Sequence, residues 1–197
     1  MRVPDNLQEQ KTEIRALMKK IRAGLPESLR HAHSRLILGH LAGLDEVISA
    51  KSVFIYISYG SEVDTHAVIR RLLDEGKSLA VPKIINADRM ISVPFTTWKD
   101  LKPDVMGILT AGTNIPYSGS LDIAIAPGLG FTIAGGRIGF GRGYYDQWFK
   151  TNTVKSRIAL AFEAQLIEQL PVGVNDVPVD IIVTEKRVIR VIKPIDE

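Results

Sequence analysis

The apolar positions of the chain alternate between the spacing typical of helices and that typical of strands. Apolar residues that recur every three or four positions predict amphipathic helices. Proline and glycine then mark where helices are interrupted or closed. The helices that this pattern predicts are Leu7–Leu25, a second from the break at Pro26 to about Leu44, a third from a cap at Asp64 or Thr65 to Glu75, one that begins at Tyr144, and a short one around Gln165–Leu170.

Short apolar runs bounded by turn residues predict the strands. The expected strands are Ser52–Ser58, Ser78–Ile85, Arg89–Phe95, Leu121–Ala126, Arg157–Phe162, and Val188–Ile192 as a final hairpin strand reached through the turn at Thr184–Lys186. Strands that alternate with helices favour a three-layer α/β/α sandwich around a mostly parallel mixed sheet, with residues 1–197 as a single domain.

The segment from Trp98 to Pro116 fits neither pattern and is expected to be mostly irregular. Its apolar residues are interpreted as anchors to the rest of the molecule. These anchors are Leu101, Val105, Met106 and Ile108.

The stretch from Leu121 to Phe149 combines a buried strand, a glycine-rich loop and the start of a helix. Seven of its sixteen residues from Gly128 to Gly143 are glycine, and Arg137 and Arg142 lie among them. Glycine permits positive φ and close approach of backbone N–H groups to a ligand, and a helix N-terminus favours anions. The combination predicts a nucleotide-phosphate site, although a loop of this kind can also be only a tight connection.

The glycine pattern does not match the two common phosphate-binding motifs. GxxxxGK[ST] is absent, and the run from Gly136 reads GxxGxG, which differs from the dinucleotide pattern GxGxxG. The loop is therefore neither a P-loop nor a Rossmann fingerprint.

Composition excludes several classes of function. The chain has 197 residues, 45% of them hydrophobic and 24% charged, which is ordinary for a globular protein. Without cysteine, disulfides, thiolate catalysis and Cys-ligated zinc are excluded. A net charge of +3 suits an anionic small molecule and does not by itself indicate nucleic acid. Without a membrane-length apolar run or a signal-peptide core, we expect a cytoplasmic location and no membrane partner.

The first predicted helix carries four basic residues, Lys11, Arg15, Lys19 and Arg22, at helical spacing. A basic face of this kind usually faces solvent. That interpretation is kept for Lys19 and Arg22.

The sequences PGLGF and GGRIGFGRGYYD resemble the signature of the 5-formyltetrahydrofolate cyclo-ligase (5,10-methenyltetrahydrofolate synthetase) family. The later run VNDVPVDIIVT is similar to the family's closing motif, and the likeness extends over nearly the whole chain. The resemblance implies ATP- and Mg²⁺-dependent closure of 5-formyltetrahydrofolate to 5,10-methenyltetrahydrofolate, with release of ADP and phosphate. It also implies small-molecule substrates, and we expect a monomer.

The resemblance also implies roles for individual residues. The implied catalytic residues are Arg137, Tyr145 and Asp146. The implied ATP-binding residues are these three together with Lys11, Arg15, Gly139, Gly141, Arg142, Gly143 and Tyr144. The implied folate-binding residues are Ile57, Tyr59, Glu62, Trp98 and Tyr144, with Ser58 in the pocket wall. The candidate Mg²⁺ ligands are Asp146 and Asp180, because Mg²⁺ prefers oxygen ligands.

Two positions depart from the family's pattern. Thr132 stands where an acidic residue or asparagine is usual, and we expect it to loosen the loop or alter the polarity of the pocket. Arg142 stands where small residues or lysine are common, and it adds positive charge where phosphate is expected.

Two other functions are considered. One is a non-catalytic relative that binds folate or nucleotide, which the retained set Lys11, Arg15, Glu62, Arg137 and Asp146 argues against. The other is a different α/β enzyme that acts on a sugar phosphate, which only fold analogy supports. The sequence contains no HExxH motif, and its spacing gives no Ser-His-Asp arrangement.

Overall fold

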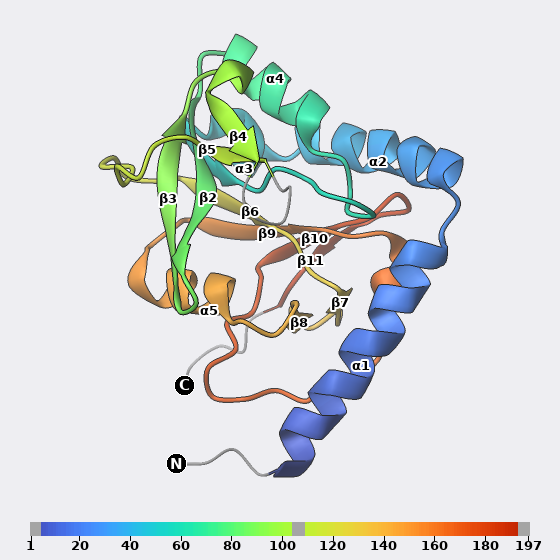
Figure 1. Ribbon diagram of the computed structural model, residues 1–197. Helices are drawn as coiled ribbons and strands as arrows, with labels where there is room; N and C mark the ends of the chain where they lie inside the picture. The colour runs from blue at the N-terminus through green and yellow to red at the C-terminus, as the bar shows by residue number, and fades with distance from the viewer. Residues whose placement is uncertain (1–4, 104–108, 193–197) are drawn as a thin grey trace.

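The computed structural model describes residues 5–103 and 109–192 of the chain (Figure 1). The helices are α1 (Asp5–Gly24), α2 (Glu27–Ala42), α3 (Asp45–Ser49), α4 (His66–Asp74) and α5 (Tyr144–Thr151), with short 3₁₀ turns η1 (Trp98–Asp100) and η2 (Glu163–Gln165). The strands are β1 (Ser52–Ile55), β2 (Ser78–Asn86), β3 (Arg89–Phe95), β4 (Leu101–Pro103), β5 (Leu109–Ala111), β6 (Ile123–Ala126), β7 (Gly130–Phe131), β8 (Arg137–Ile138), β9 (Ser156–Leu160), β10 (Ile181–Val183) and β11 (Val188–Arg190).

Seven strands form one mixed sheet in the order β11-β10-β9-β6-β1-β2-β3. The pairs from β10 to β2 are parallel, and β3 and β11 add antiparallel edges. The α/β fold with a mostly parallel sheet is therefore confirmed. The strand order reverses between β1 and β6, because β2 lies on one side of β1 and β6 on the other. Ligands in open α/β sheets bind outside the carboxyl ends of the strands at such a point.

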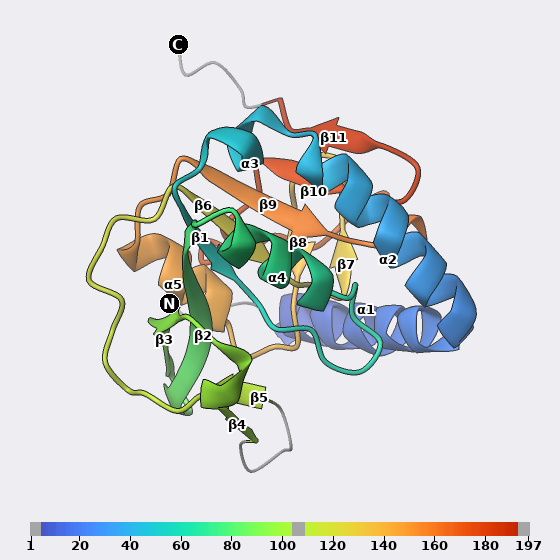
Figure 2. The ribbon, with the colours of Figure 1, turned by 90° about the horizontal axis from the view of Figure 1, so that it is seen from above.

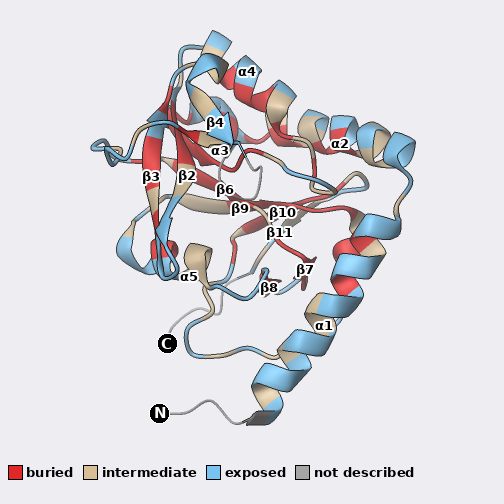
Figure 3. Cartoon of the chain, in the orientation of Figure 1, coloured by how far each residue is buried: buried red, intermediate tan, exposed pale blue. Residues whose placement is uncertain are grey.

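The two faces of the sheet are covered by different layers, because successive side chains of a strand point to opposite faces. Val53 and Ile55 of β1 pack in the core cluster that α2, α3 and α4 cover. Phe54 points to the other face and stacks on Trp148 of α5, with ring centroids 4.1 Å apart. Figure 2 shows α2, α3 and α4 in front of the strands, and Figure 3 shows the buried central strands.

The long helix α1 packs on the glycine-rich segment. Met18 of α1 is fully buried against Leu129 and Ile138, and Ile138 lies in the small hairpin that β7 and β8 form. Phe131 of the same hairpin is fully buried against the main sheet beside Ala159 and Ile182. Apolar contacts therefore hold α1, the hairpin and the sheet together, and α1 presents its inner face to the glycine-rich segment (Figure 1).

Most predicted elements are confirmed with shifted ends, and one is wrong. The first two helices, the strand Arg89–Phe95 and the final hairpin lie where the pattern placed them. The predicted helix at Gln165–Leu170 does not form. Leu166 instead bridges to Phe131, and Ile167 N–H donates to the Phe131 carbonyl, so this segment runs extended along β7.

Several short elements did not show in the apolar pattern. These are α3, the hairpin of β4 and β5 within the segment expected to be irregular, and the hairpin of β7 and β8 within the glycine-rich loop. Val105, Met106 and Ile108, interpreted as anchors, lie outside the described residues.

Candidate functional site

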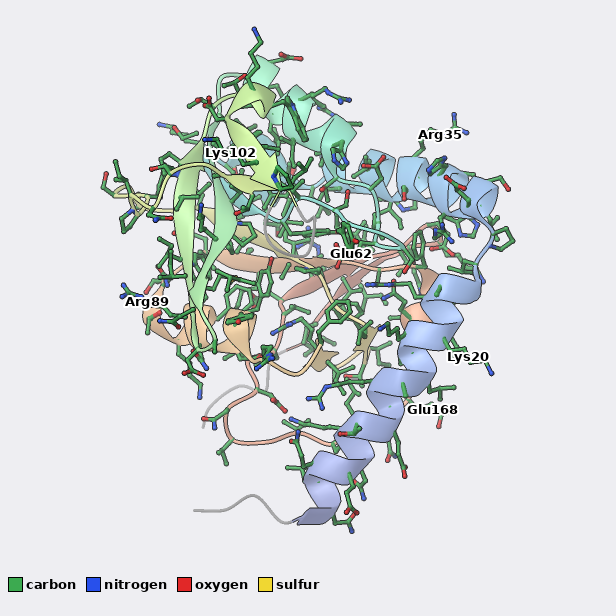
Figure 4. All side chains as sticks on the ribbon, viewed as in Figure 1. Lys20, Arg35, Glu62, Arg89, Lys102 and Glu168 are labelled. Atoms are coloured by element: carbon green, nitrogen blue, oxygen red, sulfur yellow. The ribbon has the colours of Figure 1, made fainter. Side chains whose placement is uncertain are left out.

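Two loops leave the sheet at the reversal point and form the frame of the candidate site. The loop after β1 leads to Glu62, and the segment after β6 contains the glycines. Figure 4 shows Glu62 in the middle of the molecule, between the sheet and α1. The site predicted from sequence thus lies where the topology of the sheet favours ligand binding.

The turn between β7 and β8 is closed tightly by Thr132. The Thr132 hydroxyl accepts a hydrogen bond from Gly136 N–H (3.0 Å), and Thr132 N–H donates to the Gly136 carbonyl (2.9 Å). Gly135 has φ +86°, and an added Cβ there would lie 2.5 Å from the Val179 carbonyl oxygen. The Thr132 hydroxyl is thus a partner for the turn's backbone, and the effect of threonine in place of the usual acidic residue or asparagine stays a prediction.

A cavity of about 180 Å³ opens beside this turn. Lys11 of α1 and Arg137 of β8 contribute its positive charge, and Leu170 and Pro171 contribute apolar wall. The Lys11 ammonium pairs with the carboxylate of Asp176, which also accepts a hydrogen bond from Gly173 N–H at 2.8 Å. Two basic groups from distant parts of the sequence therefore meet at one concave site of a size that suits part of a small anionic ligand.

Arg137 is the most deeply buried charged group at this cavity, with a side chain 3% exposed. Its Nη2 donates to Asp146 Oδ1 at 2.8 Å, and its guanidinium lies 5.6 Å from the ring centroid of Tyr145. Among the described residues its Nε is buried without a hydrogen-bond partner. Because an orphaned buried donor is costly, this atom needs an acceptor that the described residues do not supply.

Asp146 stands in the first turn of α5 and has two partners. Its Oδ1 accepts from Arg137 Nη2 and from Val177 N–H, the latter at 3.1 Å. Both hydrogen bonds that the described residues give this carboxylate end on Oδ1, and Oδ2 receives neither of them. One carboxylate together with triphosphate oxygens suits Mg²⁺, which usually keeps several waters, so Asp146 fits the group that the resemblance implies.

Asp180, the second candidate metal ligand, lies in a different environment. Its carboxylate accepts from Arg157 through the backbone N–H (2.7 Å) and through Nε (3.1 Å). Within residues 5–103 and 109–192, no group of three or more His, Asp or Glu side chains is arranged to hold a metal. The structure pairs Asp146 and Asp180 with different arginines, and use of Asp180 as a ligand stays a prediction.

Arg15 and the glycines around it form the second contact of α1 with the loop. Arg15 Nε donates to the Gly139 carbonyl at 3.1 Å, and its guanidinium lies 3.4 Å from where a Cβ of Gly141 would stand. Gly141 and Gly143 have φ of +105° and +67°, a region that favours glycine. Arg142 between them is exposed.

Glu62 is largely buried and faces both an arginine and two tyrosines. Its Oε2 accepts from Tyr59 N–H at 3.0 Å, and its Oε1 lies 3.8 Å from Nη1 of Arg22. Burial raises the pKa of Glu62, while Arg22 and the Tyr59 N–H act to lower it. The positive charge of Arg22 therefore favours the ionised form of the Glu62 carboxylate, and burial disfavours it.

Tyr145 is near both Arg137 and Glu62, since the Arg137 guanidinium lies 5.6 Å from its ring centroid and the charge of Glu62 acts on its hydroxyl. Burial is the main cause that raises the pKa of its hydroxyl; the negative charge of Glu62 adds to the rise and the positive charge of Arg137 opposes it. Tyr56, whose hydroxyl donates to the Val63 carbonyl, has its pKa raised chiefly by the same burial. Tyr145 consequently stays protonated at neutral pH, and its hydroxyl has a proton to donate.

The remaining predicted folate-binding residues are less closely grouped. Tyr59 is 54% exposed, whereas Ile57 is buried in the core. Trp98 stacks on His66 with ring centroids 5.0 Å apart and reaches the loop after β1 through that ring. Tyr144 donates from its hydroxyl to the Asn86 carbonyl at 3.2 Å, at the far end of β2.

The loop after β1 also brings together Ser58, Asp64 and His66, which the spacing did not indicate. Nδ1 of His66 lies 2.7 Å from Asp64 Oδ1 and 3.1 Å from Ser58 Oγ. A catalytic triad needs the acid and the nucleophile on different ring nitrogens. Because both contacts end on Nδ1, this cluster does not have the arrangement of a triad; Asp64 Oδ1 also accepts from the backbone N–H of His66 at 2.9 Å, at the start of α4.

Arg22, Asp176 and Gln165 also contribute to the site and were not among the predicted site residues. Arg22 is 5% exposed, so its interpretation as part of a solvated face is wrong, whereas Lys19 is exposed as expected. Gln165, 1% exposed, donates to the carbonyls of Gly128 and Leu129. For Arg22, its position around the helix axis was a signal in the sequence. At 100° per residue, Arg22 lies within about 20° of Lys11 around the axis of α1, so both are on the same side of the helix.

Comparisons with known proteins agree with the resemblance found in the sequence. A sequence model of the 5-formyltetrahydrofolate cyclo-ligase family matches residues 7–185. The chain is 27% identical to the 5-formyltetrahydrofolate cyclo-ligase of Mus musculus, over 89% of this chain and 93% of that protein. It is 29% identical to the cyclo-ligase of Haemophilus influenzae, over 89% and 98% of the two chains. The solved structure of 5,10-methenyltetrahydrofolate synthetase from Aquifex aeolicus has a TM-score of 0.83 and 29% identity, with 95% of each chain covered.

Proposed function

The chain is an enzyme of the 5-formyltetrahydrofolate cyclo-ligase family, and we propose that it closes 5-formyltetrahydrofolate to 5,10-methenyltetrahydrofolate with ATP and Mg²⁺, releasing ADP and phosphate. The observation that carries the proposal is the cavity between α1 and the glycine-rich hairpin. It joins Lys11 to the buried Arg137, whose Nε has no partner among the described residues. These two cations suit an anionic co-substrate.

The proposed reaction has two steps. The formyl oxygen attacks the γ-phosphorus of ATP, the bond from that phosphorus to the β,γ-bridging oxygen breaks, and ADP leaves. N10 then attacks the formyl carbon, the carbon–oxygen bond breaks, phosphate departs with the former formyl oxygen, and N10 loses its proton. Enzymes that transfer phosphoryl groups act mainly by positioning and by stabilising charge.

The chain's own residues supply that positioning and charge. We propose that Lys11 and Arg15 hold the triphosphate from α1, and that Arg137 Nε and the backbone N–H groups of Gly139 to Gly143 contact the transferred phosphoryl group. The protonated Tyr145 would donate a hydrogen bond at the junction of the two substrates. Glu62, at the end of the loop after β1, would bind the polar edge of the folate ring.

Magnesium would be held by Asp146 together with phosphate oxygens, since Asp146 Oδ2 carries neither of its two hydrogen bonds. When bound, Mg²⁺ neutralises part of the triphosphate's charge. Asp146 also orients Arg137 through the 2.8 Å hydrogen bond, so it would serve both the cation and the arginine.

The first test is a spectrophotometric assay of the purified protein with 5-formyltetrahydrofolate, Mg²⁺ and ATP. The methenyl product absorbs in the near ultraviolet, where the substrate does not, and the expected result is growth of that band only when ATP is present. A flat trace from protein that binds both substrates would favour a non-catalytic relative. Failure to bind ATP would favour a different α/β enzyme.

Location and assembly stay predictions from the sequence, namely the cytoplasm and a monomer. Among the described residues, no helix is long and apolar enough to cross a membrane. Gel filtration with light scattering would measure the assembly state.

A further inference from the structure

Arg22 of α1 is buried at the point where the two loops of the site approach each other. Its Nη1 donates to the Gly128 carbonyl at 3.1 Å, and its Nε donates to Ser61 Oγ at 3.1 Å. Gly128 opens the glycine-rich segment after β6, and Ser61 precedes Glu62 in the loop after β1. One guanidinium therefore ties together the two loops that diverge at the reversal of strand order.

Two further contacts extend this link in both directions. Nη1 of Arg22 lies 3.8 Å from Oε1 of Glu62, and its guanidinium lies 5.4 Å from the ring centroid of Phe140. Phe140 follows Gly139, whose carbonyl accepts from Arg15. Arg22 thus contacts the glycine-rich segment near its start, at Gly128, and near its end, at Phe140. It also lies beside Glu62 in the loop after β1.

The geometry of α1 explains why this arginine points inward. At 100° per residue, Lys11, Arg15 and Arg22 lie within about 40° of one another around the helix axis. Met18, fully buried, lies on the same side. Lys20 lies elsewhere on the helix and points to solvent (Figure 4). The inner face of α1 therefore carries three arginine or lysine side chains along the length of the site.

We propose that Arg22 is a positioning residue, which fixes the loop carrying Glu62 against the glycine-rich segment and so holds the folate and the nucleotide in register. The inference rests on the proposed function for the identity of the two ligands. Arg22 itself is not assigned a contact with either ligand, because its Nε and Nη1 already donate to Ser61 and Gly128. Its planar guanidinium suits the task, because it presents several donors in a fixed geometry that lysine lacks.

The charge of Arg22 has a second consequence for Glu62. The groups that face Glu62 are Arg22 from α1, Tyr56 from the end of β1 and Tyr145 from α5, and Arg22 is the cation among them. Burial is the main cause that lowers the pKa of Arg22, and the positive charge of Arg30 of α2 adds to the lowering. Glu62 and Tyr56 oppose it. Removal of the Arg22 charge would take away an influence that lowers the pKa of Glu62, so that pKa would rise.

The test measures ligand binding and turnover separately. Isothermal titration calorimetry would measure the binding of 5-formyltetrahydrofolate alone and of Mg²⁺-ATP alone, so that no reaction occurs. The variants are Arg22→Met, Arg22→Lys, Ser61→Ala, Glu62→Gln and Arg15→Ala, with Lys20→Met as the control. Thermal unfolding and circular dichroism would check folding of each variant. The pH dependence of kcat/KM would be recorded for wild type, Arg22→Met and Arg22→Lys.

We expect Arg22→Met to weaken both ligands and to reduce turnover by about 100-fold, since small misplacements of reacting groups are costly. Glu62→Gln should weaken folate alone, Arg15→Ala should weaken ATP alone, and Lys20→Met should match wild type. The acid limb of the pH profile should move to higher pH in Arg22→Met and return toward the wild-type position in Arg22→Lys, whose kcat should remain low.

A folded Arg22→Met protein with wild-type affinity for either ligand would overturn the inference, as would an unmoved acid limb. If Arg22→Met does not fold, Arg22→Lys and Ser61→Ala decide: weaker binding of both ligands supports the inference, and wild-type binding of both overturns it. A wild-type protein that binds both ligands without turnover would reject the proposed function and leave the binding test of Arg22 valid.

Discussion

The described residues contain two arginine–aspartate ion pairs, which differ in how many hydrogen bonds the arginine makes to its aspartate. Arg137 reaches Asp146 through Nη2 alone, its side chain is 3% exposed, and its buried Nε has no partner among the described residues. Arg157 meets Asp180 through Nε, Nη2 and its backbone N–H, with a side chain 24% exposed. The first pair borders the cavity, and the second joins the starts of two adjacent strands, β9 and β10.

The difference shows how a structural ion pair and a ligand-ready one can be told apart. The Arg157–Asp180 pair holds β9 to the segment before β10 through three hydrogen bonds. In the Arg137–Asp146 pair the buried Nε of the arginine has no acceptor among the described residues, and a buried group of this kind calls for an explanation, for which we propose a ligand. Both aspartates were candidate metal ligands from sequence, and both assignments stay predictions.

The largest effect is expected from Arg137→Ala. Loss of a charge that would stabilise the transferred phosphoryl group should reduce kcat by about 10²–10³-fold. Steady-state kinetics with the methenyl absorbance would measure it, with Arg157→Ala as the matched control from the second pair. Near wild-type kcat in a folded Arg137→Ala protein would remove Arg137 from the mechanism.

A smaller loss is expected from Asp146→Asn. The amide oxygen can still accept from Arg137, but its lost charge should weaken Mg²⁺ binding and reduce kcat by about 10–100-fold. The Mg²⁺ concentration for half-maximal rate should rise, and a magnesium titration at saturating ATP would show it. If Asp180→Asn shifts that concentration and Asp146→Asn does not, the assignment of the two aspartates must be exchanged.

Arg15→Ala should act on ATP binding more than on chemistry. Its hydrogen bond to Gly139 supports the loop, and we expect the KM for ATP to rise by about 3–10-fold, with the KM for the folate unchanged. Initial rates at varied ATP would test this. A wild-type KM for ATP would contradict a role for Arg15 in the nucleotide site.

The smallest effect on turnover is expected from Arg157→Ala, which sharpens the contrast between the two pairs. Removal of its hydrogen bonds to Asp180 should destabilise the protein by about 1–3 kcal/mol. Urea unfolding would measure that loss, and kcat should stay within about twofold of wild type because the pair lies away from the cavity. A large fall in kcat at unchanged stability would show that the second pair also serves catalysis.

The amino-acid sequence by itself determined most of the elements and the position of the glycine-rich segment. The spacing of apolar residues gives the period of a helix or strand directly, and glycine and proline mark the ends. The family signature depends on contiguous residues from Pro127 to Asp146, so it could be read without a structure. The helix predicted at Gln165–Leu170 failed because local propensity gave way to pairing of its backbone with Phe131.

The tertiary structure decided which charged residues act together. Lys11 and Asp176 lie 165 positions apart, and Arg22 and Gly128 lie 106 apart, so neither contact has a local signal. Lys19 and Arg22 carry the same charge and lie on the same helix, yet Lys19 is exposed and Arg22 is buried. Their burial differs because it depends on what packs against each side of α1. Arg137 and Arg157 differ in whether Nε has a hydrogen-bond partner, and this difference can be seen only when the partners of each atom are known from the structure.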